Sequence, residues 1–178
     1  TTGSYEQALE PLSRAIELGD VSGQNYGLLG VIYMQKEDYL AAEGAFRNAL
    51  MMNPKSKDWK LNLFQTMMYQ ERWEESAALL RPLINEDPNN AEYWKYLANV
   101  YIGLNRPLEA AEVLEIRDRM GRSDAQSLEM LATIYFNNQL YDVAYDVYKR
   151  AIDTSGSRFE SLFNSAQALA QVGKFEDA

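Results

Sequence analysis

Apolar and polar positions along the chain follow a pattern that repeats every 34 residues. A small residue stands at each step of one series: Ala8, Ala42, Ser76, Ala110, Ala144 and Ala178. An aromatic residue stands at five of the six steps of a second series, namely Tyr5, Tyr39, Trp73, Tyr141 and Phe175, and the remaining step is Pro107. Because the register is kept along the whole chain, it indicates one structural unit in several copies.

The clearest copy, residues 23–56, contains two apolar faces with helical spacing. The first face consists of Tyr26, Leu29, Gly30 and Tyr33, and the second of Ala42, Phe46 and Ala49. A polar turn at residues 35–38 separates them, and Asp38 is expected to cap the second helix. Pro54 follows that helix and ends it. Each copy is therefore predicted to be a hairpin of two antiparallel helices.

The register divides residues 1–178 into a single array of such hairpins. It predicts the second helix of an incomplete copy at 4–18, four complete copies at 23–56, 57–90, 91–124 and 125–158, and the start of a fifth at 159–178. Both ends fall inside a copy, and neither has the polar outer face of a capping unit. We therefore expect the sequence to be a fragment of a longer protein.

Three local features qualify the pattern. Gly30 and Ala42 are small enough to let the two helices of a hairpin touch. Phe64 stands where other copies carry a small residue, so its hairpin is expected to pack differently. Pro82 lies inside a predicted second helix and is expected to kink it or open it locally, whereas Pro107 falls in a first turn, where proline is tolerated.

The pattern resembles that of the tetratricopeptide repeat (TPR) family, whose unit has 34 residues. The third complete copy carries Trp94, Leu97, Ala98, Tyr101, Ala110 and Leu114 at the positions that define the family. The resemblance implies an all-α fold, a right-handed superhelical solenoid of antiparallel helix hairpins, and a scaffold that binds other proteins. A finer similarity at residues 58–59, 92–95 and 128–132 is to bacterial TPR proteins associated with TonB-type systems. It favours a bacterial periplasmic location, with the cytoplasm as the alternative.

Composition excludes several classes of function. The net charge is −9, which disfavours nucleic acid and anionic membrane surfaces as partners. The chain has no cysteine and no histidine, so we expect no catalytic residue, no metal site and no cofactor. No apolar segment is long enough for membrane insertion. The densest basic group, Arg117, Arg119 and Arg122, is interpreted as solvated surface.

In the TPR family the first helix of each copy lines the concave face, at unit positions 2, 5, 9, 12 and 13. These positions predict a groove that binds a peptide or partner protein, made of Met34, Leu61, Gln65, Met68, Tyr69, Lys95, Asn99, Ile102, Thr133, Phe136, Asn137, Phe163 and Gln167. The large residues at position 12 would form an apolar seam along it; alternatively, they pack on adjoining helices. The amides could bond the partner's backbone.

A carboxylate clamp, which some family members use to bind chaperone C-termini, is not expected here. Lys95 and Asn99 match its first pair, but Met130, Glu160 and Asn164 stand where the other clamp residues are required. The prediction is therefore a non-catalytic protein-interaction scaffold. The alternatives are the non-catalytic repeat region of a larger enzyme, and a module that self-associates through its unfinished repeat ends.

Overall fold

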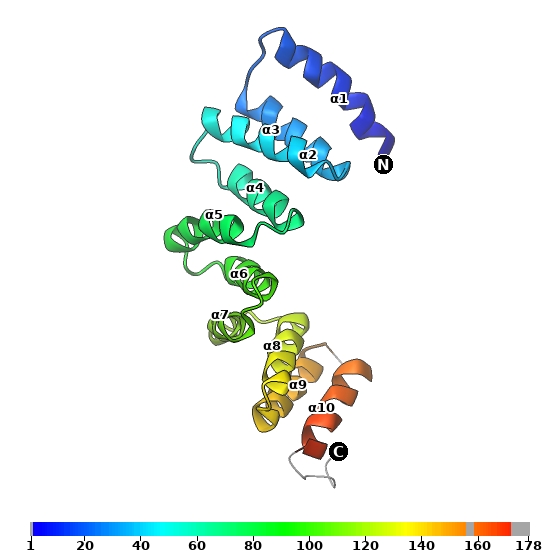
Figure 1. The fold of residues 1–178 in the computed structure, drawn as a ribbon, viewed down its shortest axis with the longest axis vertical. Helices are drawn as coiled ribbons and strands as arrows, with labels where there is room; N and C mark the ends of the chain where they lie inside the picture. Colours follow the sequence, from blue (N-terminus) through cyan, green and yellow to red (C-terminus); the bar gives the residue numbers. More distant parts are fainter. Residues whose placement is uncertain (1, 156–158, 172–178) are drawn as a thin grey trace. The chain divides into compact units, whose positions relative to one another are not determined.

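The computed structural model describes residues 2–155 and 159–171, and within these ranges all regular secondary structure is helical (Figure 1). The helices are α1 (Thr2–Glu17), α2 (Gly23–Gln35), α3 (Tyr39–Met52), α4 (Lys57–Tyr69), α5 (Trp73–Glu86), α6 (Ala91–Gly103), α7 (Pro107–Arg119), α8 (Ala125–Asn137), α9 (Tyr141–Ser155) and α10 (Phe159–Gln171). The all-α prediction is confirmed. Of the predicted fifth copy, residues 172–178 lie outside the described part.

Side-chain caps explain where most first helices begin. Ser22, Ser56 and Asp124 accept hydrogen bonds from backbone N–H groups in the first turns of α2, α4 and α8. Asn90 does the same for α6. The expected cap of a second helix is also present, since the Asp38 carboxylate accepts from the Ala41 N–H at 3.1 Å. These bonds satisfy N–H groups that have no partner inside the helix.

The turn inside each hairpin has the same backbone geometry in all four complete copies. Its third residue adopts a left-handed conformation with φ near +60°, and the residues concerned are Glu37, Glu71, Asn105 and Gln139. The next residue donates its N–H five residues back, as Asp38 does to the carbonyl of Tyr33 at 3.0 Å. This is the hydrogen bond that closes a Schellman-type helix end. The turn thus recurs with the 34-residue period although none of the four residues is glycine.

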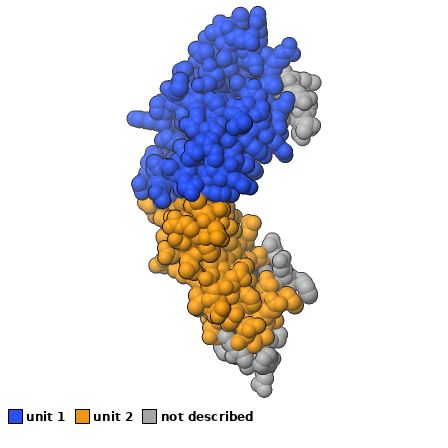
Figure 2. Space-filling view, viewed as in Figure 1, with its two compact units in different colours: residues 1–86 blue, residues 87–178 orange. Residues whose placement is uncertain are grey.

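Two compact units can be distinguished, residues 1–86 and residues 87–178 (Figure 2). In unit 1, α1 packs on α2, α2 on α3, α3 on α4 and α4 on α5. Its core includes Ala42 and Phe46 of α3 and Leu63 and Met67 of α4. In unit 2, the hairpins α6–α7 and α8–α9 pack on each other, and α10 packs on α9.

Gly30 lies directly against a ring of the other helix of its hairpin, as predicted. A Cβ atom added there would stand 2.6 Å from Cε1 of Phe46. One turn earlier, Gly27 lies against the next copy, where an added Cβ would stand 2.3 Å from Cη2 of Trp59. These two glycines therefore admit large rings on two sides of α2.

The second copy packs differently, as expected from Phe64. This side chain is fully buried in α4, and fewer backbone positions of α4 and α5 lie close together than in the other three complete hairpins. Pro82 is exposed and lies inside α5, which continues beyond it to Glu86. Pro107 begins α7, in agreement with the prediction that it is tolerated there.

The interpretation of Arg117 as solvated surface is wrong, because its side chain is only 3% exposed. From α7 it donates hydrogen bonds to the carbonyl of Ala91 at 3.2 Å and to the Ser127 hydroxyl at 2.8 Å. It also pairs with Glu92 at 2.9 Å and Asp124 at 3.3 Å. The fork of the guanidinium thus joins α6, α7 and the start of α8. Arg119 and Arg122 are exposed.

Candidate functional site

A pocket of about 580 Å³ lies in unit 2, and side chains of α6, α7, α8 and α10 contribute to it. Its apolar lining consists of Ile102, Pro107, Met130 and Ile134. Amide side chains form much of the rest, namely Asn105, Gln126, Asn137, Asn138 and Asn164. Glu129 and Thr133 complete the lining. The size lies within the range of about 300–1,000 Å³ that is usual for ligand sites.

The pocket brings together three of the predicted groove residues from two helices. Ile102 is near the end of α6, and Thr133 and Asn137 lie one turn apart on α8. Ile102 is 41% exposed, so part of its apolar side chain is open to solvent. Thr133 is held in place, since its hydroxyl donates to the carbonyl of Glu129 at 2.8 Å and lies 2.9 Å from the Tyr148 hydroxyl.

Asn105 and Pro107 were not among the predicted site residues. They belong to the turn and to the first residue of a second helix, and the prediction considered only first helices. The signal that could have found them is the break in the aromatic series at Pro107.

Lys95 and Asn99 matched part of a carboxylate clamp, but Lys95 is already engaged within the chain. Its Nζ atom donates to Asp124 at 3.0 Å and to the amide oxygen of Gln126 at 3.4 Å. Asn99 is half-buried. Of the other clamp positions, Met130 and Asn164 line the pocket, and the side chain of Glu160 lies outside those described.

The carboxyl group of Asp124 is the most strongly perturbed acid near the site. Burial alone would raise its pKa, but hydrogen bonds from Ser127 and Lys95 and the charge of Arg117 outweigh this effect. The net result is that the pKa of Asp124 lies well below its usual range. Asp124 is therefore an anion that anchors Lys95 and Arg117.

Four of the five predicted groove residues of unit 1 are half-buried, and the fifth, Tyr69, is exposed. Met34 packs on the core cluster of Ala42, Phe46, Leu63 and Met67, and its sulfur accepts a hydrogen bond from the Thr66 hydroxyl at 3.1 Å. For Met34, packing on an adjoining helix is therefore what the structure shows. Leu61, Gln65 and Met68 are half-buried.

Tyr69 is 62% exposed and stacks on Tyr39 of the preceding hairpin, with ring centroids 4.9 Å apart and planes 6° from parallel. The backbone next to the stack is fixed as well, because the side-chain amide of Gln70 donates to the carbonyl of Tyr39 at 3.3 Å.

The remaining predicted residues lie in unit 2. Phe136 is half-buried and makes an edge-to-face contact with Tyr141, with centroids 5.3 Å apart. Phe163 and Gln167 are exposed on α10. Neither Phe136 nor these two residues line the pocket.

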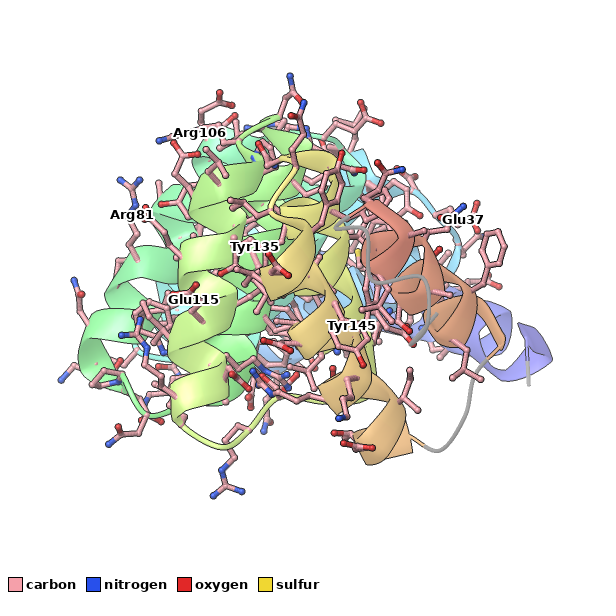
Figure 3. The ribbon with its side chains drawn as sticks, turned by 90° about the horizontal axis from the view of Figure 1, so that it is seen from below. Glu37, Arg81, Arg106, Glu115, Tyr135 and Tyr145 are labelled. Atoms are coloured by element: carbon pink, nitrogen blue, oxygen red, sulfur yellow. The ribbon has the colours of Figure 1, made fainter. Side chains whose placement is uncertain are left out.

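A hydrogen bond outside the pocket joins Tyr135 of α8 to Glu115 of α7, two residues that are labelled in Figure 3. The Tyr135 hydroxyl donates to the Glu115 carboxylate, and the pKa of Tyr135 is raised, first by burial and then by this bond. Neither side chain lines the pocket. Over the described ranges, no group of three or more acidic side chains could hold a metal ion. No described helix is both long enough and apolar enough to cross a membrane.

Comparison with known families agrees with this architecture. Two family models described as tetratricopeptide repeat match residues 33–100 and residues 125–157. Together they cover more than half of the chain. The chain belongs to the tetratricopeptide repeat family, and its fold is an all-α helical repeat solenoid.

Among curated proteins, the chain is similar to the type IV pilus assembly protein PilF of Pseudomonas aeruginosa. The two are 25% identical over 178 residues, which cover 98% of this chain and 69% of that protein. A solved structure of Pseudomonas aeruginosa PilF has a TM-score of 0.76 at 22% identity, covering 98% of this chain and 79% of that one.

Two further solved structures support the fold at lower identity. The C-terminal part of a TPR protein from Cytophaga hutchinsonii has a TM-score of 0.84 at 14% identity, covering 96% of this chain and 67% of that one. YrrB, described as a TPR protein with an unusual peptide-binding site, has a TM-score of 0.72 at 14% identity, covering 93% of this chain and 85% of that one. The finer resemblance to TonB-associated proteins stays a prediction, since none of these similarities bears on it.

Proposed function

We propose that this chain is a non-catalytic interaction scaffold that holds a segment of a partner protein along the exposed face of its first helices. The observation that carries the proposal is the pocket of unit 2, on which Ile102, Thr133 and Asn137 converge. We further propose that residues 1–178 form the single repeat array predicted from the sequence.

The chemistry of the lining suits a peptide. Primary amides have both a donor group and an acceptor oxygen, so they can pair with the N–H and C=O groups of an extended backbone. The exposed side chain of Ile102 gives an apolar contact that removes surface from water on binding. Glu129 and the net charge of −9 disfavour an acidic partner.

The relatives suggest a setting for this activity. PilF is named as a protein of type IV pilus assembly, and its similarity extends over 98% of this chain. We propose that this chain also serves the assembly of a bacterial envelope structure, and that it works in the periplasm. YrrB supports the peptide ligand, because its structure is described as having a peptide-binding site.

The experiment is affinity capture with the chain as bait in an extract of the organism that encodes it, followed by mass spectrometry of the retained proteins. The test variant combines Ile102→Ser and Asn137→Ala, which alter the pocket. The matched control is Leu108→Ser, because Leu108 is an exposed aliphatic residue of α7 that does not line the pocket. We expect the test variant to lose about tenfold or more of the capture, as for an anchor residue of an interface.

Circular dichroism is used to check that both variants keep the helical content of the native chain, because only then can their capture be compared. Equal capture by the test variant and the native chain would contradict binding at this face. Failure of the native chain to retain any protein would contradict the scaffold proposal itself.

Self-association is the second candidate, because Leu162 and Phe163 are both exposed on α10. Light scattering over a range of concentrations tests it. A mass that rises with concentration in the native chain, and not in a Phe163→Ser variant, would support a role of α10 in joining two copies.

A further inference from the structure

We propose that the pocket of unit 2 binds an uncharged aromatic side chain of the partner segment, a phenylalanine, tyrosine or tryptophan. This inference rests on the proposed function, since it names the side chain by which a bound peptide would be anchored.

Two residues that line the pocket occupy repeat positions at which unit 1 has aromatic residues. Pro107 and Asn137 stand two periods after Tyr39 and Tyr69. In unit 1, Tyr39 and Tyr69 stack face to face, one from the first residue of a second helix and the other from the end of the next first helix. The same two places in unit 2 hold a proline and an asparagine and border an open pocket.

The absence of the aromatic residue at Pro107 sets this hairpin apart. Among the complete copies, the other second helices begin with Tyr39, Trp73 and Tyr141. Tyr39 contacts the ring of Tyr69 in the next hairpin, and Tyr141 contacts the ring of Phe136 within its own hairpin. At Pro107 the first residue offers only a pyrrolidine ring, and Asn137 has no ring to fill the space beside it. A ring supplied by a ligand would replace the missing contact between neighbouring copies.

The walls suit a ring rather than a charged group. Ile102, Met130 and Ile134 present aliphatic and thioether surface, and a thioether makes favourable contacts with aromatic rings. The amides of Asn105 and Asn137 supply partners for the hydroxyl of a tyrosine or the N–H of a tryptophan. Among the described residues no lysine or arginine lines the pocket, whereas Glu129 does, so an anionic group such as a phosphate or a carboxylate is disfavoured there.

The test uses small probes and the intact chain. N-acetyl-tyrosinamide, N-acetyl-tryptophanamide and N-acetyl-leucinamide are each titrated to millimolar concentrations, and methyl spectra of the protein are recorded by nuclear magnetic resonance. We expect the two aromatic amides to displace the methyl signals of Ile102, Met130 and Ile134 through the ring current, with saturation. The leucine amide should leave these signals in place, and Leu108 should be unaffected by all three.

A filled-pocket variant provides the second arm. Pro107→Tyr combined with Asn137→Tyr restores both rings of the unit 1 pair, and we expect it to weaken binding of the aromatic amides by about tenfold or more. Asn137→Tyr alone changes only an exposed residue at the end of α8, so it keeps the test valid should the double variant fold poorly. In each variant, helical content is checked by circular dichroism.

Equal displacement by the leucine amide, or unchanged binding of the aromatic amides to Asn137→Tyr, would overturn the inference. Capture experiments separate this from the proposed function. If the native chain and Asn137→Tyr retain partner proteins equally, the scaffold proposal is supported and the aromatic pocket is contradicted. If the native chain retains no protein although its pocket binds the aromatic amides, the scaffold proposal is contradicted and the pocket is a site for small molecules.

Discussion

The guanidinium group of Arg117 and the hydroxyl group of Ser127 form a buried hydrogen bond of 2.8 Å between α7 and α8. The same guanidinium also bonds the carbonyl of Ala91 at the start of α6. Since its planar fork serves both acceptors at once, one side chain connects α6, α7 and α8 within unit 2. Unit 2 therefore owes part of its internal order to a polar group in its core.

Replacing Arg117 with alanine should lower the stability of the chain by roughly 1–3 kcal/mol, because it leaves the Ser127 hydroxyl and the Ala91 carbonyl without their partner. Arg119→Ala is the control, because Arg119 is 73% exposed and lies on the same helix; its effect should stay within about 0.5 kcal/mol. Urea denaturation followed by circular dichroism measures both. Equal midpoints for the two variants would show that the buried bonds contribute nothing.

Stability should fall in acid in a manner that depends on Asp124. Its pKa in the folded chain is depressed, so its contribution is fully present above the unfolded-state pKa of about 3.9 and is lost as the pH falls through the folded-state pKa. Asp124→Asn keeps a residue that can cap α8 but removes the charge. We expect the urea midpoint of the native chain to fall more between pH 7 and pH 3 than that of the variant.

Asp146→Asn, an exposed acid on α9, serves as the control for the pH experiment. Its acid dependence should match that of the native chain. If Asp124→Asn behaves like Asp146→Asn, the ion pairs of Asp124 with Lys95 and Arg117 do not stabilise the fold.

Two glycines of unit 1 should respond in opposite ways to alanine. At Gly27 the new Cβ would stand 2.3 Å from the ring of Trp59, so this ring must be displaced or α2 and α4 must move apart, at a cost of about 1–3 kcal/mol. At Gly44, inside α3, an added Cβ meets nothing within 4 Å, and alanine should stabilise the chain by about 0.5–1 kcal/mol through its higher helix propensity. Thermal unfolding of the two variants gives the comparison. Stabilisation by Gly27→Ala would mean that Trp59 can move aside freely.

The helix hairpins were predictable because their signal is periodic. A small residue such as Ala42 and a ring such as Tyr39 return in the same register, so each copy supports the assignment of the next. The positions of the turns could be predicted from their polar residues. The left-handed backbone conformation of one residue in each turn could not. Positions such as Glu37 and Glu71 carry no glycine, and the sequence alone gives no sign that they adopt a positive φ.

The interior role of Arg117 and the pocket were harder to predict for a different reason. Burial of an arginine depends on acceptors supplied by distant residues, here Ala91 and Ser127, and no local pattern reveals them. The pocket includes Ile102 and Asn137, which the groove positions of the family did suggest. It also includes Pro107, which stands where another copy has the aromatic residue Tyr39. The sequence does not show that an aromatic side chain at this position contacts the next copy, whereas the stacked rings of Tyr39 and Tyr69 do.

The stacked rings of Tyr39 and Tyr69 should be energetically coupled, whereas the equivalent residues of unit 2 should not be. A double-mutant cycle with Tyr39→Ala and Tyr69→Ala is expected to give a coupling energy of about 0.5–1.5 kcal/mol, since stacked aromatic pairs gain that much beyond burial of their area. The matched cycle with Pro107→Ala and Asn137→Ala should give a value near zero, because no ring contact joins those side chains across the pocket. Urea denaturation of the native chain, the four single variants and the two double variants supplies both numbers. Equal coupling in the two cycles would mean that Pro107 and Asn137 already make the contact for which a ligand ring is proposed, and the physical basis of the aromatic pocket would be lost.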